Sequence, residues 1–285
     1  MRKLKFSPGV RSLALSLIAL LLPVGAFGHS LYIQSGRHFV SSGKGTPLFF
    51  CYGHHIPVDD PVRREKLAWV KVFPPDGTSR EIALRDGKSL HSYVILYEIP
   101  GTWVLAAETT PGFFTMWYDQ KNRKRHSIKP MSTVADKASK VETSVRSSQW
   151  TKTYVTCERP SAKFPAHIGL PLEIVPARDV YGLKLNDKLE FQAYMDGKPY
   201  TGDGFYDATY NGFSPHAEDL YIPRTPVTGG KFEVDLAAAG RWYIRFFTKT
   251  DPPENLRSEF LKEKRTSTLV FELPGERKRP KADDH

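Results

Sequence analysis

Short β-prone segments, each followed by a turn signal, are the feature that most constrains how this chain can fold. In the N-terminal half, three segments rich in Val, Ile, Tyr and Trp lie at 66–73, 92–99 and 102–108. Asp-Gly and Pro-Gly dipeptides separate them, and such dipeptides are typical of tight turns. No segment before residue 130 keeps a helical period. Short strands at this spacing predict an antiparallel β-sandwich.

The C-terminal half shows a regular alternation of apolar and polar residues. Apolar side chains occupy every second position at 188–195, 232–236, 242–246 and 269–273. Alternation of this kind fits sheets with one buried face and one solvated face. We therefore predict an all-β chain with two antiparallel β-sandwich domains.

Changes in composition indicate where the domains begin and end. We predict a signal peptide at 1–28, an N-terminal sandwich at 29–120, a connector at 121–165, a C-terminal sandwich at 166–275 and a charged tail at 276–285. Within the polar connector, 149–157 is predicted to return to the N-terminal sandwich as a strand. The C-terminal sandwich is expected to fold on its own, because domains of about 100 residues commonly do so.

The first 28 residues have the pattern of a secretory signal. Four basic residues accompany a ten-residue apolar run at 13–22, which is too short to cross a bilayer as a helix. Small residues at Ala26 and Gly28 permit cleavage before His29, although cleavage after Ala26 also fits. We expect an exported protein. No later apolar run approaches the length of a membrane span, so we expect no transmembrane segment in the mature chain.

Cleavage before His29 would give this residue a free amine, which can chelate one metal ion together with the imidazole Nδ1. His54 and His55 follow a β-prone run and Gly53, and they are expected to be exposed. Imidazole nitrogen suits Ni, Co, Cu and Zn. We therefore predict a metal site on His29, His54 and His55 that takes Ni²⁺ or Co²⁺, with Cu²⁺ as an alternative. The competing interpretation is a set of surface histidines without a ligand.

The remaining histidines are interpreted differently. Hydrogen bonding within the fold is the expected role of four of them, namely His38, His91, His126 and His167. His216, which lies beside Glu218 and Asp219, is a weaker ligand candidate in the second domain.

Charge and motifs exclude several function classes. The full chain has a formal net charge of +10, and the first 28 residues carry four of the basic side chains, so the chain from His29 has +6. With no zinc-finger spacing and no basic recognition helix, this excess argues against nucleic-acid binding. The basic runs at 121–125 and 277–279 are interpreted as solvated, with weak attraction to an acidic membrane surface as the alternative. Nucleophile-elbow, phosphate-loop and dinucleotide motifs are absent, and we predict no catalytic residue.

The two cysteines, Cys51 and Cys157, both lie in β-prone stretches. Export would expose them to oxidation, and we predict a disulfide between them. Two buried free thiols, or Cys51 as a soft metal ligand, are the alternatives.

A series of motifs along the chain resembles a known family. The motifs are His29 directly after the signal, Gly53-His54 followed by Asp59-Asp60, Pro100-Gly101-Thr102-Trp103-Val104-Leu105, Leu172-Glu173-Ile174-Val175-Pro176, Asp196-Gly197-Lys198-Pro199 and Gly240-Arg241-Trp242-Tyr243-Ile244-Arg245. In this order they resemble a bacterial periplasmic family of unknown function associated with nickel and cobalt uptake, as accessory proteins of energy-coupling-factor-type transporters. The resemblance implies two immunoglobulin-like or fibronectin-like sandwiches, a periplasmic location and a membrane metal-importer complex as partner.

Three functional hypotheses follow. The first is a periplasmic accessory protein that delivers nickel or cobalt to an importer and is not an enzyme. The second is a copper oxidoreductase of the histidine-brace type, which would share the N-terminal histidine. The third is a metal-free carbohydrate-binding or adhesive sandwich that uses the aromatic residues Tyr206, Tyr210 and Phe213.

Overall fold

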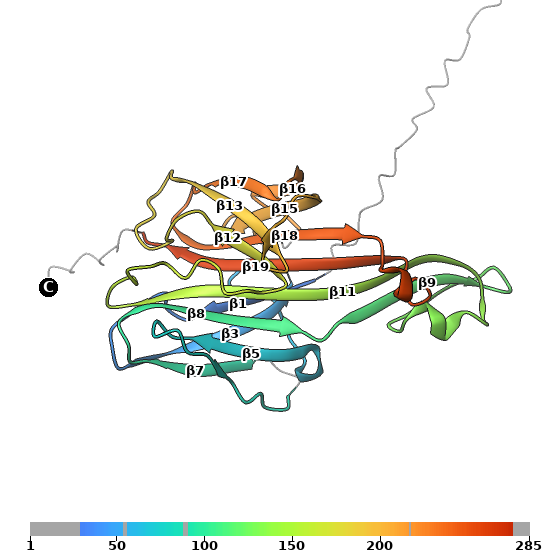
Figure 1. Ribbon diagram of the computed structural model, residues 1–285, viewed down its shortest axis with the longest axis horizontal. Helices are drawn as coiled ribbons and strands as arrows, with labels where there is room; N and C mark the ends of the chain where they lie inside the picture. The colour runs from blue at the N-terminus through green and yellow to red at the C-terminus, as the bar shows by residue number, and fades with distance from the viewer. Residues whose placement is uncertain (1–28, 54–55, 88–90, 217, 276–285) are drawn as a thin grey trace, which may run out of the picture.

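The computed structural model describes residues 29–53, 56–87, 91–216 and 218–275 (Figure 1). These residues form three β-sheets, so the all-β prediction is confirmed. The helical elements in the described part are the short 3-10 helices η1 (Arg64–Lys66), η2 (Met131–Val134) and η3 (Glu254–Leu256). None of the helices described here has the length and apolarity that crossing a membrane takes.

The N-terminal sheet has β3 (Lys44–Gly53) at its centre. Its other strands are β1 (Ser30–Ser35), β7 (His91–Tyr97) and β4 (Asp60–Pro61), and all three pair with β3 in antiparallel fashion. Every residue of β1 is buried, although this strand forms an edge of its sheet.

The central sheet contains strands from both halves of the chain. Its main path runs β16 (Ile222–Thr228), β15 (Asp203–Tyr210), β18 (Gly240–Thr250), β19 (Lys262–Leu273), β11 (Ala138–Cys157), β8 (Gly101–Thr109), β5 (Leu67–Phe73) and β6 (Arg80–Glu81). Three further strands join it, namely β2 (Phe39–Val40), β9 (Gly112–Asp119) and β10 (Lys124–Ser127). The C-terminal sheet consists of β12 (Leu172–Pro176), β13 (Lys188–Met195), β14 (Lys198–Pro199) and β17 (Lys231–Asp235).

The central sheet supplies one wall of both hydrophobic cores. Along β8, Leu105 and Ala107 pack in the core beneath the N-terminal sheet, whereas Val104 and Ala106 pack in the core beneath the C-terminal sheet. Successive side chains of a strand point to opposite faces, so one strand can serve two cores. The fold is therefore two immunoglobulin-like β-sandwiches that share their middle layer.

The 20-residue strand β11 joins the two halves. It pairs in antiparallel fashion with β8, from Tyr154 opposite Val104 onward, which confirms the strand predicted at 149–157. On its other side it pairs with β19, and this pairing is parallel. The segment 121–165, predicted as a connector, thus contains a strand that is hydrogen bonded to both sandwiches.

A three-stranded ribbon projects from the sandwiches at the right of Figure 1. It is formed by β9, β10 and the first half of β11. We call residues 112–146, which include η2, the arm.

The predicted disulfide between Cys51 and Cys157 is wrong, because both are free, buried thiols. Cys51 packs with Tyr32 and Tyr243, whereas Cys157 lies in the core of the N-terminal sandwich. Phe50, the neighbour of Cys51 on β3, also points into that core. Alternation along the strand therefore directs Cys51 to the opposite face, away from Cys157.

Candidate functional site

The start of β1 and the end of β3 bring His29 next to an acidic strand. Ser30 is paired with Gly53, and Tyr52 is paired with Asp60 on β4. This register places the His29 Nδ1 atom 3.6 Å from the Asp60 Oδ2 atom. The His29 ring also contacts the edge of the Tyr52 ring, with 5.7 Å between the ring centroids.

The His29 and Asp60 side chains are 49% and 64% exposed, respectively. An ion pair this exposed contributes little to stability, because water screens it. The imidazole and the carboxylate therefore remain accessible to an external cation. Nitrogen and oxygen donors of these types suit Ni²⁺, Co²⁺ and Zn²⁺.

The backbone at the end of β3 lies close to Asp59. A β-carbon at Gly53 would overlap the half-buried Asp59 carboxylate, so only glycine fits at this position. The Asp59 carboxylate also accepts a hydrogen bond from the Asp60 amide at 2.9 Å. The antiparallel pairing of β4 with β3 holds the acidic pair against the strand that carries Tyr52.

Gln149 on β11 fixes the beginning of β1. Its side-chain Nε2 donates to the His29 carbonyl at 3.2 Å and to the Tyr52 hydroxyl at 3.3 Å. Its Oε1 accepts from the Leu31 amide at 2.6 Å. Because β1 is an edge strand, these side-chain bonds satisfy backbone groups that no neighbouring strand pairs.

Ser30 is fixed from the other side by a buried ion pair. The Arg245 guanidinium donates to the Asp207 carboxylate and, at 3.1 Å, to the Ser30 hydroxyl. The Arg245 and Asp207 side chains are almost fully buried. A charge at this depth is tolerated when it is paired and hydrogen bonded, as it is here. The backbone that carries His29 is therefore held rigidly, while its ring faces solvent.

Of the three predicted ligands, the structure describes only His29. His54 and His55 lie outside the described residues. Among the residues that the structure does describe, no group of three or more His, Cys, Asp and Glu side chains is arranged to hold a metal ion. His216 lies on an exposed loop between β15 and β16, where its amide donates to the Ser214 hydroxyl.

The expected hydrogen-bonding role is confirmed for His38, which is buried and lies with its Nδ1 atom 2.9 Å from the Tyr154 carbonyl. Burial lowers the pKa of His38 to about 4. His167 pairs with Glu173 at 3.4 Å, whereas the exposed His126 stacks on Phe114. The side chain of His91 lies outside the described residues.

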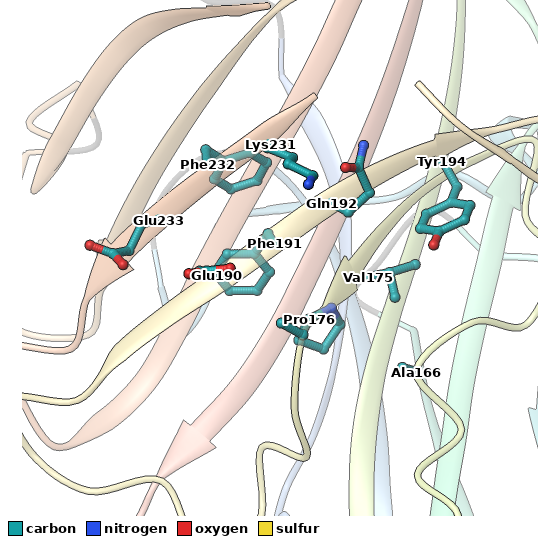
Figure 2. Close-up of a pocket in the computed structure, with 11 residues that line it drawn as sticks. Ala166, Val175, Pro176, Glu190, Phe191, Gln192, Tyr194, Lys231, Phe232 and Glu233 are labelled. Atoms are coloured by element: carbon teal, nitrogen blue, oxygen red, sulfur yellow. The ribbon is translucent and has the colours of Figure 1, made fainter. Parts of the chain in front are cut away.

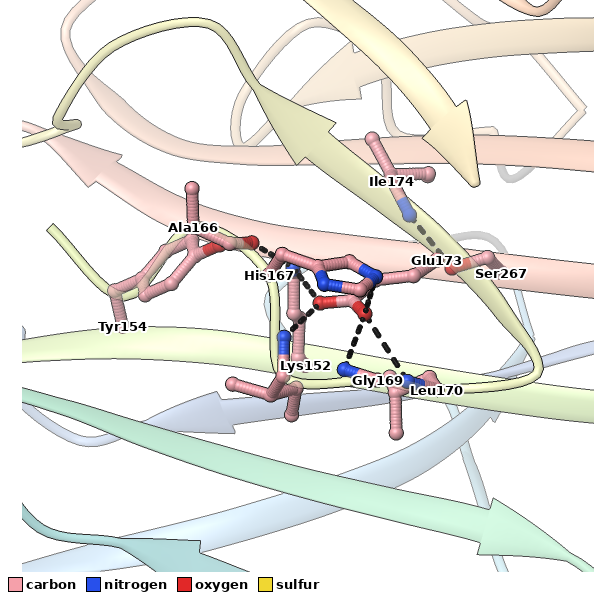
Figure 3. A network of polar contacts seen from close by, with 10 residues as sticks. Lys152, Tyr154, Ala166, His167, Gly169, Leu170, Glu173, Ile174 and Ser267 are labelled. Carbon is pink, nitrogen blue, oxygen red and sulfur yellow. Dashed lines mark hydrogen bonds and ion pairs between the residues drawn. The ribbon is translucent and has the colours of Figure 1, made fainter. Parts of the chain in front are cut away.

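A second polar cluster surrounds the buried carboxylate of Glu173 (Figure 3). This carboxylate accepts hydrogen bonds from three consecutive backbone amides, at Ile168, Gly169 and Leu170, and from the Lys152 ammonium. Lys152 also donates to the Ala166 carbonyl, and burial lowers its pKa. With its acceptor positions occupied, this cluster ties the loop before β12 to β11 and is structural.

A groove of about 710 Å³ lies on the C-terminal sheet (Figure 2). Strands β12, β13 and β17 line it, and its charged side chains are Glu190, Lys231 and Glu233. Gln192 points into this region, but its Nε2 donates to the Ala193 and Gly229 carbonyls. Among the described residues that line the groove there is no Ser, Cys or His that could serve as nucleophile or base.

The three aromatic residues proposed for carbohydrate binding do not share one exposed face. Tyr206 stacks on Phe232 with 4.4 Å between ring centroids and is packed against the core. Tyr210 packs against Trp242 at 4.9 Å. Phe213 is 40% exposed, so it is the most accessible of the set.

Sequence reasoning identified His29 as a ligand but gave Asp59-Asp60 only as a motif of the family resemblance, and it missed three residues that hold the site, Gln149, Arg245 and Asp207. These residues lie 120, 216 and 178 positions after His29, in strands whose local sequence carries no sign of this contact. Only the pairing of distant strands brings them to the beginning of β1. No short-range pattern predicts such a contact.

Comparisons with known proteins identify a family. No curated protein matches this chain. Among solved structures, the chain is similar to Escherichia coli alpha-2-macroglobulin activated by porcine elastase, with 11% identity and a TM-score of 0.24 over 87% of this chain. The chain spans 20% of the length of that protein. It is also similar to the fibronectin(III)-like modules of Clostridium thermocellum CbhA, with 10% identity, a TM-score of 0.20 and coverage of 87% of this chain and 100% of the other.

The sequence comparison is more specific than these distant structural similarities. The family model of a domain of unknown function, DUF4198, matches residues 26–250. This range includes the start of β1, β3 and β4 with the His29–Asp60 pair, the whole of β11, and most of the C-terminal sandwich. The chain therefore belongs to the DUF4198 family.

Proposed function

We propose that this protein is an extracytoplasmic metal-binding accessory protein for nickel or cobalt uptake, with its cation site at His29. The observation that carries the proposal is the 3.6 Å approach of the His29 ring to the Asp60 carboxylate at an exposed strand end. The Ser30–Gly53 pair is the last of the β1–β3 register, and His54 and His55 follow Gly53 directly in the sequence. His54 is the additional ligand that we test first.

The chemistry of the donors favours a borderline transition metal. If the mature chain begins at His29, its amine and Nδ1 atom form a bidentate chelate, and Asp60 adds an oxygen donor. The ring and the amine must be unprotonated to bind, so affinity should rise with pH. Gln149 and Arg245 hold the backbone of β1 in place, which reduces the ordering that binding would otherwise require.

The proposal also assigns a location and a partner. The signal-like segment at 1–28 supports export to the periplasm, and the resemblance to nickel- and cobalt-associated proteins supports a membrane importer as partner. An exposed site suits transfer of a metal ion to another protein better than permanent storage. Cells that lack this protein should therefore accumulate less nickel or cobalt at limiting metal concentrations.

The test is calorimetric titration of Ni²⁺ into protein that begins at His29. The variants are His29→Ala, Asp60→Asn, His54→Ala and a chain with one glycine added before His29. His216→Ala, at an exposed histidine elsewhere, is the matched control. Loss of a ligand should weaken binding by about tenfold or more, since each 1.4 kcal/mol corresponds to roughly a factor of ten.

Three results would count against the proposal. Unchanged affinity in all four site variants would show that the metal, if bound, sits elsewhere. Consumption of reductant and oxygen by Cu²⁺-loaded protein, abolished by His29→Ala, would instead support the copper oxidoreductase. Specific binding of an oligosaccharide without any metal requirement would favour the carbohydrate-binding hypothesis.

A further inference from the structure

The arm has one covered face and one face without a partner. On β9, the alternate residues Thr115 and Trp117 are buried, and the η2 residue Val134 is buried as well. The residues of β9 that alternate with these point the other way, and they include Phe114, which is 41% exposed. The exposed face has no second sheet layer in Figure 1.

Exposed apolar side chains gather at this uncovered face. His126 stacks on Phe114, with 6.3 Å between ring centroids and 23° between the ring planes. Ile128, which directly follows β10, is 81% exposed and is the most exposed large hydrophobic residue in the described part of the chain. We take Ile128 and Phe114 together as the apolar part of an interaction surface, because exposed apolar groups that lie together mark such surfaces more than single ones do.

The arm that carries these apolar residues has an excess of positive charge. Residues 112–146 contain eight Lys or Arg side chains and three Asp or Glu side chains. Asp119 is already paired with Arg123 and Arg125, and Glu142 is paired with Lys124. The lysines of the arm that form no ion pair with a described residue are Lys121, Lys129, Lys137 and Lys140, and all four are exposed.

The carboxylates that approach the arm from its neighbours leave this excess in place. Arg146 is paired with Glu263 on β19, and Glu259, next to η3, accepts a hydrogen bond from the Ser132 hydroxyl. Both contacts lie toward the sandwiches or on the η2 side. Neither carboxylate forms an ion pair with any of the four exposed lysines.

We infer that the arm binds the surface of an anionic phospholipid membrane. Exposed apolar side chains that enter the boundary between headgroups and acyl chains, with lysines beside them that meet lipid phosphates, are the pattern of interfacial attachment. The inference stands on the arm alone and does not depend on metal binding at His29.

The test is sedimentation of the protein, beginning at His29, with two kinds of protein-free vesicle. One contains phosphatidylglycerol and phosphatidylcholine, and the other contains phosphatidylcholine alone. We expect binding to the anionic vesicles only, with an affinity that falls as salt concentration rises, because salt screens the charges. Replacing Lys121 and Lys129 by Glu should weaken this binding by at least about tenfold.

The apolar contribution is tested by Ile128→Asp, which should reduce binding severalfold. Matched controls are Val94→Asp, at a residue that is 76% exposed on the N-terminal sheet, and the pair Lys44→Glu and Lys198→Glu, which removes two exposed lysines outside the arm. Both controls should bind as the wild type does. Thermal unfolding of each variant checks that the sandwiches are intact.

Three outcomes would overturn the inference. Failure of the folded wild-type protein to bind anionic vesicles would contradict the inference directly. Equal loss of binding in the control variants would show that general charge, and not the arm, is responsible. Binding to natural bacterial membranes but not to protein-free vesicles, lost in the arm variants, would mean that the arm binds a membrane protein instead.

Discussion

At the scale of single residues, Gly53 shows how tightly the strand end beside His29 is packed. The overlap that a β-carbon would make with Asp59 involves a short, half-buried side chain that is also bonded to the Asp60 amide. Neither partner can move far without disturbing β4. The glycine is therefore required by the acidic pair and not by backbone conformation, since its φ angle is not positive.

We predict that Gly53→Ala destabilises the protein by about 1–3 kcal/mol, as overpacking in a filled region does. Gly112→Ala, where a β-carbon would meet no atom within 4 Å, is the control and should change little. The double variant Gly53→Ala/Asp59→Ala should recover much of the loss, because it removes the two carboxylate atoms that come closest and leaves only the Asp59 β-carbon in close contact. Urea unfolding measures all three, and equal effects of the two glycine substitutions would contradict this account.

A second residue-scale prediction concerns pH. The pKa of His38 is lowered to about 4 by burial, whereas in the unfolded chain it is near 6.5. Between these values the unfolded chain binds more protons, so the free energy of unfolding should fall as pH falls from 6.5 to 4. This difference in the pKa of His38 contributes about 3 kcal/mol in full to the free energy of unfolding.

His38→Gln keeps a side-chain donor for the Tyr154 carbonyl but cannot titrate. The difference in unfolding free energy between wild type and this variant should therefore shrink or reverse between pH 7 and pH 4.5. Other buried acids titrate in both proteins and cancel in the comparison. A difference that is independent of pH would mean that His38 is not the responsible group.

At the scale of elements, the strands were largely predictable where alternation and turn residues agree. The segments predicted at 66–73, 102–108 and 188–195 correspond to β5, β8 and β13 within one residue at each end. Both signals are local, so they are present in the sequence before folding. The N-terminal part of β11 was not predicted, because residues 138–148 are mostly polar and become a strand only through pairing with β9 and β19.

The loop before β12 gives an element-scale prediction. The Glu173 carboxylate accepts hydrogen bonds from three loop amides and pairs with Lys152. We predict that Glu173→Gln lowers the free energy of unfolding by about 3 kcal/mol, because it weakens these bonds and leaves the buried ammonium without its counter-charge. Glu190→Gln, at an exposed position on the same sheet, should have almost no effect. Chemical denaturation compares the two, and loop amides should also exchange hydrogen faster in the first variant.

At the scale of the whole molecule, the shared central sheet makes the two sandwiches depend on each other. The core beneath the C-terminal sheet includes Trp150 and Tyr154 from β11 and Val104 and Ala106 from β8. A fragment that begins at Ile168 lacks all four of these side chains and the strand beside β19. Independent folding of the C-terminal sandwich, expected from its alternating strands, stays a prediction. The shared sheet shows which side chains and which strand the isolated fragment would lack.

We expect a fragment that begins at Ala138, and so retains β11, to be clearly more stable than one that begins at Ile168. The reason is that β11 pairs with β19 and fills the core with two large aromatic side chains. Thermal unfolding followed by circular dichroism compares the fragments with the chain from His29. Equal, cooperative transitions in both fragments would show that the C-terminal strands need no partner from the first half.

Because β11 is continuous, it also sets the distance between the arm and His29. Lys140 lies in the arm, and Gln149 holds the backbone of His29, so nine residues of one strand separate the two. At about 3.3 Å per residue, they are roughly 30 Å apart along the strand. A protein attached to a bilayer by its arm would thus hold His29 at a set distance from the point of attachment, and a transporter would have to receive the metal there. Inserting two residues into β11 between them would lengthen that distance by about 7 Å and leave every side chain on its original face.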